Sequence, residues 1–331
     1  MNVLIVTNMF ANENSSQPSQ GTFVSEQVEA LRRLSGIDVD VLVVKGFLSR
    51  WAYLSSLFEI LLRLRSRRYD VIHYHFGLTA WSAPIVRSLT NSKIVITLHG
   101  SDVFGRALLR WITRVAVRFA HTCIAVSDEI RDVIEPVSPG CVTIPCAVDD
   151  TLFRPLAKKP TSPTHKTVIF PSSASRPEKD YTLFASVLDR LRIISTDVIV
   201  ERRIENMSRD EVRDLLQQAD ALVMTSKREG SPQTIKEAMA CGLPVVSVEV
   251  GDVPHLLQGV RHCRVVEHRD PLLIASALRE VMAPGERTNG PERLAEAGYL
   301  STDVAQRVRV IYDMVTKSKT DKSTRDRHDH K

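Results

Sequence analysis

The sequence predicts an α/β protein with two Rossmann-like domains. Its 331 residues suit two ordinary domains, and 43% hydrophobic and 25% charged residues are typical of a globular protein. Short apolar strands alternate with amphipathic helices in both halves, which is typical of parallel sheets. A proline-rich stretch without periodicity, 154–166, is expected to link an N-terminal domain, 1–153, to a C-terminal domain, 167–300.

The composition narrows the classes of partner. A net charge of +5 favours anionic partners, without choosing between phosphates, acidic lipids and nucleic acid. No aromatic stacking motif or recognition helix is evident, so we expect no nucleic-acid partner. Five cysteines without a C-x-x-C pair, and a strand rather than a signal sequence at the start, indicate a cytoplasmic protein. No apolar stretch reaches the ~20 residues of a membrane span.

The N-terminal half opens with a strand, Val3–Thr7, and a helix, Val24–Leu34. The polar loop between them ends at Gly21, and a long loop after a parallel strand is often functional. The next strand, Asp38–Val44, begins with D-V-D. That triplet could be a metal-binding D-x-D motif, although a strand start accounts for it equally well.

Two helices in this half carry many arginines. An apolar stripe over Trp51–Leu64 is followed by arginines, and the helix near Arg106–Arg118 places four arginines on one face. Two interpretations stay open. The helices have ordinary solvated basic faces, or they contact an anionic membrane at its inner face.

Histidines end two predicted strands. The strand Asp70–His75 places His73 and His75 on one side, and the strand Lys93–Leu98 runs into His99. A His-x-His pair can bind zinc, but no cysteine or carboxylate joins it at ligand spacing, so we expect no metal site.

The most informative stretch is 219–250. A buried strand, Ala221–Ser226, leads through a polar loop to a helix, Gln233–Cys241, with Ser231 as the expected N-cap. The start of such a helix binds anions, so a diphosphate fits there. Glu229 and Glu237 flank this point. Because carboxylates repel phosphate, we expect them to bind hydroxyl groups.

The pattern E-G-x-P-x-x-x-x-E-A closely resembles the E-x7-E motif of the family 4 retaining glycosyltransferases, which have the GT-B fold, with two Rossmann-like domains facing a cleft. The resemblance implies that Glu229 binds the donor sugar and Glu237 the ribose of the nucleotide. It also implies that the start of the helix binds the donor, through Gly230, Ser231, Pro232, Gln233 and Thr234.

The resemblance assigns four further residues more loosely. Gly21 would approach the donor phosphates, although the family usually has a glycine pair there. His99 would contact the donor sugar and align the reacting centre. Arg176 and Lys179, between the strand near Val168 and the next helix, would stabilise the leaving diphosphate, without a metal or other cofactor.

By this resemblance the protein moves a sugar, with retention, from a nucleotide-diphosphate sugar to a saccharide or lipid-linked saccharide. Polysaccharide or glycolipid assembly is the expected setting. Two alternatives stay open, a sugar-nucleotide epimerase and a non-catalytic GT-B partner subunit. The resemblance also suggests that a final helix, 301–316, packs on the N-terminal domain, and composition predicts a disordered tail at 317–331.

Overall fold

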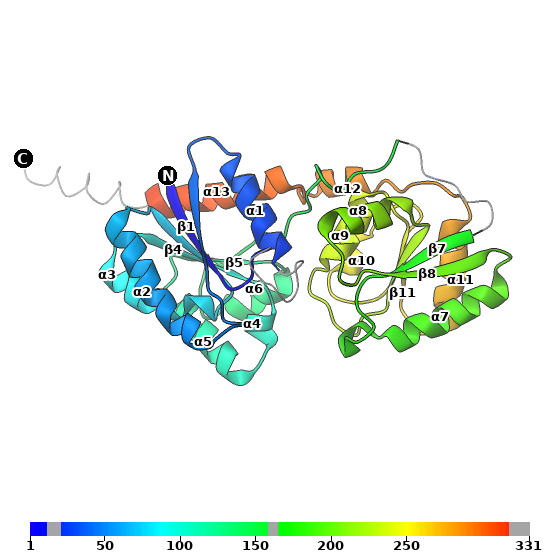
Figure 1. Cartoon of the computed structure of the whole chain (residues 1–331), viewed down its shortest axis with the longest axis horizontal. Helices are drawn as coiled ribbons and strands as arrows, with labels where there is room; N and C mark the ends of the chain where they lie inside the picture. Colours follow the sequence, from blue (N-terminus) through cyan, green and yellow to red (C-terminus); the bar gives the residue numbers. More distant parts are fainter. Residues whose placement is uncertain (12–20, 158–164, 318–331) are drawn as a thin grey trace, which may run out of the picture. The chain divides into compact units, whose positions relative to one another are not determined.

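The computed structural model describes residues 1–11, 21–157 and 165–317. It divides into two compact units, the first formed by residues 1–146 with the segment from 301, and the second by residues 147–300. Most of the predicted linker, and the predicted tail from 318, lie outside the described residues. Figure 1 shows that each unit is an α/β layer structure.

The first unit is built on a parallel sheet with the strand order β2-β1-β3-β4-β5-β6. Its strands have almost no exposed apolar side chains, because helices cover both faces. In chain order the elements are β1 (Asn2–Thr7), α1 (Thr22–Arg32), β2 (Asp38–Val43), α2 (Trp51–Ser66), β3 (Val71–His75), η1 (Thr79–Ser82), α3 (Ala83–Leu89), β4 (Lys93–Leu98), α4 (Ser101–Phe104), α5 (Ala107–Val117), β5 (Thr122–Ala125), α6 (Asp128–Ile134) and β6 (Val142–Thr143).

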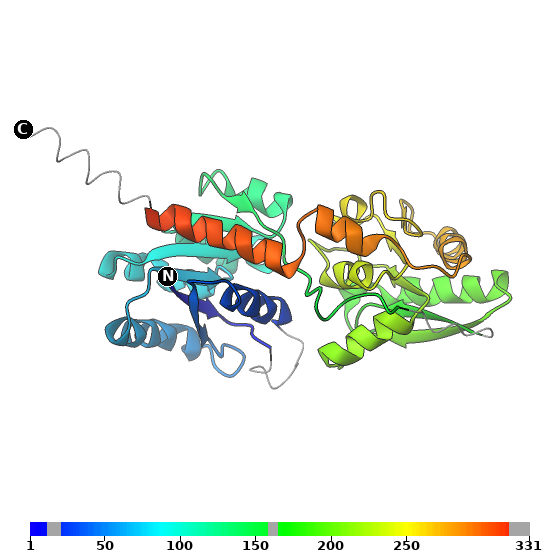
Figure 2. The ribbon, with the colours of Figure 1, turned by 90° about the horizontal axis from the view of Figure 1, so that it is seen from above.

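The last helix, α13 (Ser301–Lys317), belongs to this first unit and lies along it (Figure 2). Its fully buried Tyr312 makes a hydrogen bond of 2.6 Å with Nδ1 of His73 in β3. The other ring nitrogen of His73 bonds to Thr97 in β4, at 2.7 Å. Both nitrogens of a buried imidazole are therefore satisfied by neighbouring elements, which ties α13 to the centre of the sheet.

The second unit has a five-stranded parallel sheet with the order β11-β10-β9-β7-β8. Its elements are β7 (His165–Phe170), η2 (Pro177–Lys179), α7 (Tyr181–Ile194), β8 (Val198–Arg203), α8 (Arg209–Gln218), β9 (Ala221–Met224), α9 (Gln233–Ala240), β10 (Val245–Val248), α10 (Val253–Leu256), β11 (Arg264–Val266), α11 (Pro271–Met282) and α12 (Gly290–Glu296).

The chain enters the second unit earlier than residue 153, where the sequence placed the end of the first domain. The backbone N–H of Val148 donates to the carbonyl of Tyr299, and Phe153 lies in the core of the second unit. Burial of Phe153 and this backbone pairing account for the difference, since neither has a periodic sequence signal.

The topology locates the edge of each sheet where ligands bind. In the second sheet, β7 is followed by β8 on one side and pairs with β9 on the other. In the first, β1 is followed by β2 on one side and pairs with β3 on the other. Loops that leave such neighbouring strands in opposite directions open a crevice at the carboxyl ends of the strands. None of the described helices combines the length and apolar character needed to cross a membrane.

Candidate active site

The loops after β7 and β9 are joined by hydrogen bonds at the switch point of the second sheet. The hydroxyl of Thr225 lies 3.0 Å from the carbonyl oxygens of both Lys179 and Asp180. The backbone N–H of Lys227 donates to the carbonyl of Glu178 at 2.8 Å. These bonds fix the Lys179 backbone beside the polar loop that follows β9.

That arrangement brings together two of the residues predicted to bind the donor. Nζ of Lys179 lies 2.5 Å from a carboxylate oxygen of Glu229, and each side chain is only 13% exposed. Arg176 is placed differently. Its guanidinium is 55% exposed and pairs with Glu178 in its own loop. The structure therefore joins Lys179 to Glu229 and leaves Arg176 at the surface of the same loop.

Helix α9 begins without a side-chain cap. Its N-cap residue is Pro232, which makes no side-chain cap hydrogen bond, so the expectation that Ser231 caps the helix is wrong. The proline occupies the cap itself and displaces Ser231 into the loop. An uncapped start leaves first-turn amides for an anion, since these N–H groups have no partner within a helix. Gln233 and Thr234, in the first turn, are partly exposed.

The turn at Glu229 and Gly230 is supported from the loop after β10. The N–H of Asp252 donates to the carbonyl of Gly230 at 3.0 Å. Gly251 has a φ of 54°, and a Cβ there would lie 2.4 Å from that same carbonyl oxygen. Only glycine fits such a close approach with a left-handed backbone.

The second glutamate is held by an arginine that the sequence analysis missed. Glu237 is 3% exposed, and its carboxylate accepts a hydrogen bond of 2.9 Å from Arg209, the first residue of α8. The guanidinium of Arg209 also lies 4.6 Å from the centre of the Phe153 ring. Ser208 and Glu211 form a capping box, which fixes where α8 begins and thus where Arg209 points.

Two further polar residues near the start of α9 were also missed. Burial raises the pKa of Asp252 above its usual value, and its Oδ1 has no hydrogen-bond partner among the described residues. Lys236 in α9 is fully buried, with Nζ 5.6 Å from the centre of the Tyr299 ring. Oε1 of Gln233 likewise finds no partner in the described part of the chain. Unused buried acceptors are suited to ligand hydroxyl groups.

The first unit brings the starts of two loops together around His99. Gly21 precedes α1 with a φ of 82°, and a Cβ there would lie 2.4 Å from the backbone of Met9. The ring of Phe23, two residues on, lies 4.9 Å from that of His99. The ring of Phe76, after β3, lies 4.4 Å from His99. Phe23 therefore brings the start of α1, just after Gly21, close to His99 at the carboxyl edge of this sheet.

The imidazole of His99 is held by two neighbours. Nε2 lies 3.1 Å from Nδ1 of the buried His75, and Nδ1 lies 3.9 Å from Sγ of Cys146. The carboxylate of Asp102 accepts hydrogen bonds from the backbone N–H groups of His99, Gly100 and Gly77. Burial lowers the pKa of His99 well below its usual value, so its ring is neutral at physiological pH.

The aspartates of the D-V-D triplet are engaged by an arginine rather than arranged around a metal ion. Asp38 and Asp40 both form ion pairs with Arg67, at the end of α2. Within residues 1–11, 21–157 and 165–317, no cluster of three or more His, Cys, Asp or Glu side chains is placed to hold a metal ion.

Two parallel Rossmann-like sheets with charged residues at their switch points agree with the architecture of a GT-B glycosyltransferase. Comparison with known families agrees. The family described as "Glycosyl transferases group 1" matches residues 166–283, and "Glycosyltransferase Family 4" matches residues 20–152. The chain therefore belongs to glycosyltransferase family 4, a retaining family that uses nucleotide sugars.

Two curated relatives cover most of the chain. TuaC of Bacillus subtilis (strain 168), named for teichuronic acid biosynthesis, is 22% identical over 79% of this chain and 84% of its own. N-acetyl-alpha-D-glucosaminyl L-malate synthase of Bacillus anthracis is 23% identical over 76% of this chain and 77% of its own.

Solved structures share the fold. Sucrose-phosphate synthase from Thermosynechococcus elongatus has a TM-score of 0.77 at 16% identity, over 96% of this chain and 100% of its own. HepE of Anabaena, solved with UDP, has a TM-score of 0.69 at 14% identity, over 95% of this chain and 100% of its own. At such low identity the likeness shows the fold alone.

Removal of Arg209 tests the buried ion pair. Arg209→Ala leaves the Glu237 carboxylate buried without its arginine partner, so we expect the free energy of unfolding to fall by about 2–4 kcal/mol. Urea unfolding of the full chain measures it. The control Arg213→Ala, on the same helix, removes pairs to the exposed Asp210 and Asp214 and should cost about 0–1 kcal/mol. Equal losses for the two variants would contradict the assignment.

The buried histidines predict a dependence of stability on pH. Burial lowers the pKa of His75 from 6.5 to about 3, and that of His73 in the same direction. As the pH falls below about 6.5, the unfolded chain therefore binds protons that the folded chain does not. Stability is full above about pH 6.5 and is lost as the pH falls toward 3.

We expect His75→Phe to make this loss less steep, by up to about 1.4 kcal/mol per pH unit, because one titrating group is removed. Urea unfolding of both proteins between pH 7.5 and pH 4.5 measures the slopes. The same slope in both would show that His75 does not titrate in this way.

Proposed function

We propose that this enzyme transfers a sugar, with retention, from a nucleotide-diphosphate sugar to an anionic saccharide or lipid-linked saccharide in polysaccharide or glycolipid assembly. The main support is the pair of glutamate–cation contacts on either side of the uncapped start of α9. None of the five cysteines, all of which lie in the described part of the chain, forms a disulfide bond, which supports a cytoplasmic setting.

Each charged group at α9 has a role in the proposal. Glu237 binds ribose hydroxyl groups, and the hydrogen bond from its partner Arg209 orients the carboxylate. The first-turn amides and Lys179 bind the diphosphate and stabilise its charge as it leaves. Arg176 adds a second cation from the same loop. These assignments follow the charges, since amides and cations attract phosphate while carboxylates accept from hydroxyl groups.

Glu229 binds hydroxyl groups of the donor sugar. Its contact with Lys179 orients the carboxylate, while Asp252 and Gln233 offer further acceptors near the start of α9. We propose that the acceptor attacks on the face that the diphosphate leaves, without a covalent adduct on Glu229. His99, kept neutral by burial and oriented by His75, contributes to alignment of the reacting sugar.

The names of three relatives support an anionic acceptor. They refer to teichuronic acid, to L-malate and, for a 24% identical relative from Arabidopsis thaliana, to phosphatidylinositol. All three compounds carry negative charge, although their chemistry differs. The net charge of +5 of this chain fits such acceptors.

Calorimetry of the purified protein with UDP, GDP, ADP, TDP and their sugar conjugates tests the donor site. We expect one nucleotide to bind best, with unchanged affinity in the presence of a chelator. Glu237→Gln should weaken that binding roughly tenfold or more, since an ionised acceptor for the ribose is lost.

The control Glu280→Gln changes an exposed carboxylate on α11 and should leave binding unchanged. A nucleotide that binds both variants equally would contradict the donor site. Conversion of a nucleotide sugar into its isomer without any acceptor would favour an epimerase instead.

A further inference from the structure

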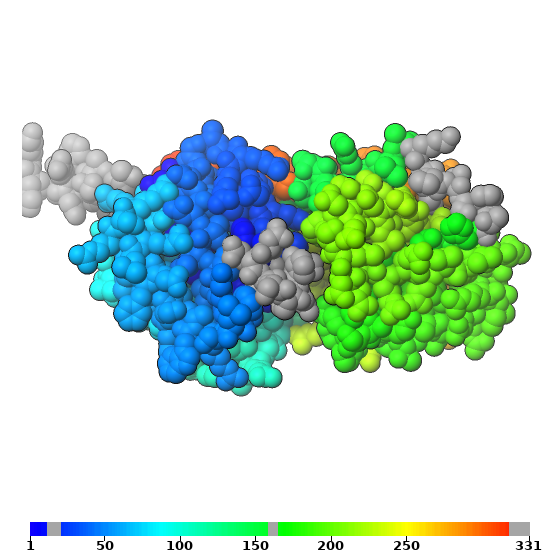
Figure 3. All heavy atoms as spheres, viewed as in Figure 1, coloured from blue at the N-terminus to red at the C-terminus, as the bar shows by residue number. Residues whose placement is uncertain are grey.

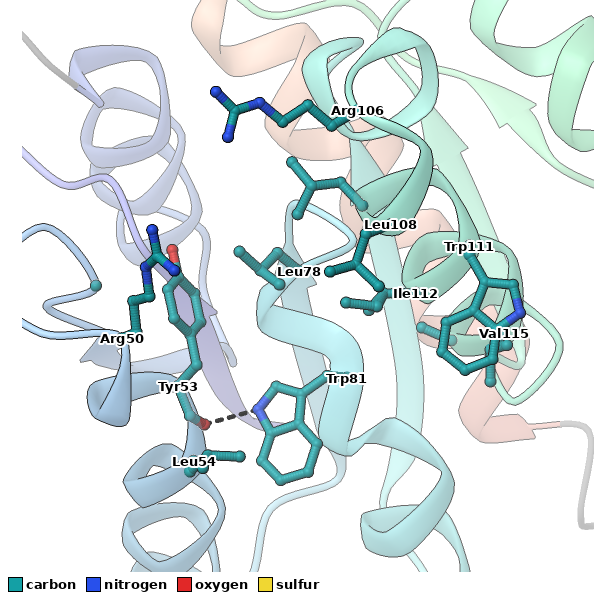
Figure 4. Close-up of a pocket in the computed structure, with 13 residues that line it drawn as sticks. Arg50, Tyr53, Leu54, Leu78, Trp81, Arg106, Leu108, Trp111, Ile112 and Val115 are labelled. Carbon is teal, nitrogen blue, oxygen red and sulfur yellow. Dashed lines mark hydrogen bonds between the residues drawn. The ribbon is translucent and has the colours of Figure 1, made fainter.

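The first unit contains an apolar pocket outside the site described above. It has a volume of about 740 Å³ and lies between α2, η1 and α5 (Figure 4). Its walls are formed mainly by Tyr53, Leu54, Leu78, Trp81, Leu109 and Ile112. A pocket of this size and lining suits the hydrocarbon part of a ligand.

The polar groups of the wall are already satisfied by the protein. The indole N–H of Trp81 donates to the backbone carbonyl of Tyr53 at 2.7 Å. The phenol oxygen of Tyr53 accepts from the side-chain amide of Asn8 at 3.0 Å. Such a wall offers apolar contact without leaving these groups unpaired when water is displaced.

Among the described residues, two arginines are the charged residues that line this pocket. They are Arg50, before α2, and Arg106, before α5. Figure 4 shows the guanidinium group of Arg106 above Leu78 and that of Arg50 to its left, beside Tyr53. An apolar pocket with two cations in its lining is complementary to a chain that ends in an anion.

The surface around the pocket is unusually apolar for a protein exterior. Helix α2 fully buries only Ser56 and Ile60. Half of its predicted apolar stripe is exposed, including Trp51 at 75% and Phe58 at 69% exposure, whereas Leu57 and Leu64 pack against the core. On α5, Trp111 is 64% exposed. Figure 3 shows α2 on the surface of the first unit. Contiguous exposed apolar groups mark an interaction site.

The charge of this surface selects the kind of partner. Residues 45–68 carry five arginines besides Lys45 and one acid, and residues 103–118 carry four arginines and no acid. Of these, Arg67 forms ion pairs with Asp38 and Asp40. Helices with Trp, Phe and Leu beside arginines are typical of proteins that contact anionic lipid.

The pocket is linked to the turn at His99 through Asp102. This carboxylate accepts from the N–H of Gly77, which precedes Leu78 of the pocket, and from the N–H of His99. The backbone carbonyl of Asp102 accepts a hydrogen bond of 3.1 Å from the hydroxyl of Thr113 in α5. Arg50, Leu78 and Arg106 lie in the connections that follow β2, β3 and β4, so the charged side of the pocket lies toward the carboxyl edge of the sheet.

We propose that this pocket binds the single hydrocarbon chain of a lipid phosphate, with the phosphate paired to Arg50 and Arg106. Such a lipid then presents its head group at the edge of the sheet where His99 lies. It is the acceptor, or carries the acceptor saccharide, and this last step rests on the proposed function. The partner is one lipid molecule with a monophosphate head, rather than a membrane surface or a protein.

Titration with decyl phosphate below its micelle concentration, followed by tryptophan fluorescence of the full chain, tests the pocket. We expect saturable binding of decyl phosphate, weaker binding of decanol and no response to inorganic phosphate. Leu108→Glu, which places a charge on the pocket lining, should weaken decyl phosphate roughly tenfold or more. Leu108 is 67% exposed, so the substitution should not disturb folding.

Each test variant has a control. Leu62→Glu is the control for Leu108→Glu, and Arg110→Gln is the control for the double variant Arg50→Gln with Arg106→Gln. Leu62→Glu changes an equally exposed leucine of α2 outside the pocket and should leave the affinity unchanged. Arg50→Gln with Arg106→Gln should weaken decyl phosphate but not decanol, whereas Arg110→Gln, on α5 outside this pocket, should do neither.

Equal losses for Leu108→Glu and Leu62→Glu would show adsorption to the surface and overturn the pocket. An equal response to inorganic phosphate would show an anion site only and would also overturn it. Nucleotide titration of the same variants separates the two proposals. Lipid binding without nucleotide binding would refute the donor site alone, and the reverse would refute the pocket alone.

Discussion

The parallel pairing of β7 with β9 is the constraint on which the chemistry of the second unit depends. Their register, Val168 with Ala221 and Ile169 with Leu222, places the ends of two strands side by side although 50 residues separate Lys179 from Glu229. The following connections leave in opposite directions, so backbone polar groups stay available there. Charged side chains and the start of α9 then share one small region.

The charges in this region already have partners before any ligand binds. Lys179 contacts Glu229 and Arg209 contacts Glu237, so neither buried carboxylate is left unpaired. In the first unit the carboxylate of Asp102 is likewise paired, since it accepts hydrogen bonds from three backbone N–H groups. These bonds join the turn at His99 to the wall of the apolar pocket. Preorganised groups of this kind need little rearrangement to stabilise charge in a ligand.

The sequence alone predicted the fold, and it proposed part of the candidate site. Alternating strands and helices, and the spacing of Glu229 and Glu237, have local signals, so both could be recognised from the chain. Arg209 could not, because its contact with Glu237 depends on how α8 packs beside α9. The signal nearest to it is the capping box at Ser208, which fixes the start of α8.

The prediction for the cap of α9 was wrong because it rested on residue type alone. A serine before a proline suits an N-cap, but the backbone of this loop places the cap at Pro232. The apolar stripe of α2 was visible in the sequence, but periodicity alone does not tell a buried face from an exposed one.

Hydrogen exchange of the full chain, with and without UDP, tests the central claim most directly. Protection by UDP over residues 229–240 would support a donor site at the start of α9, while protection confined to residues 1–146 would contradict it.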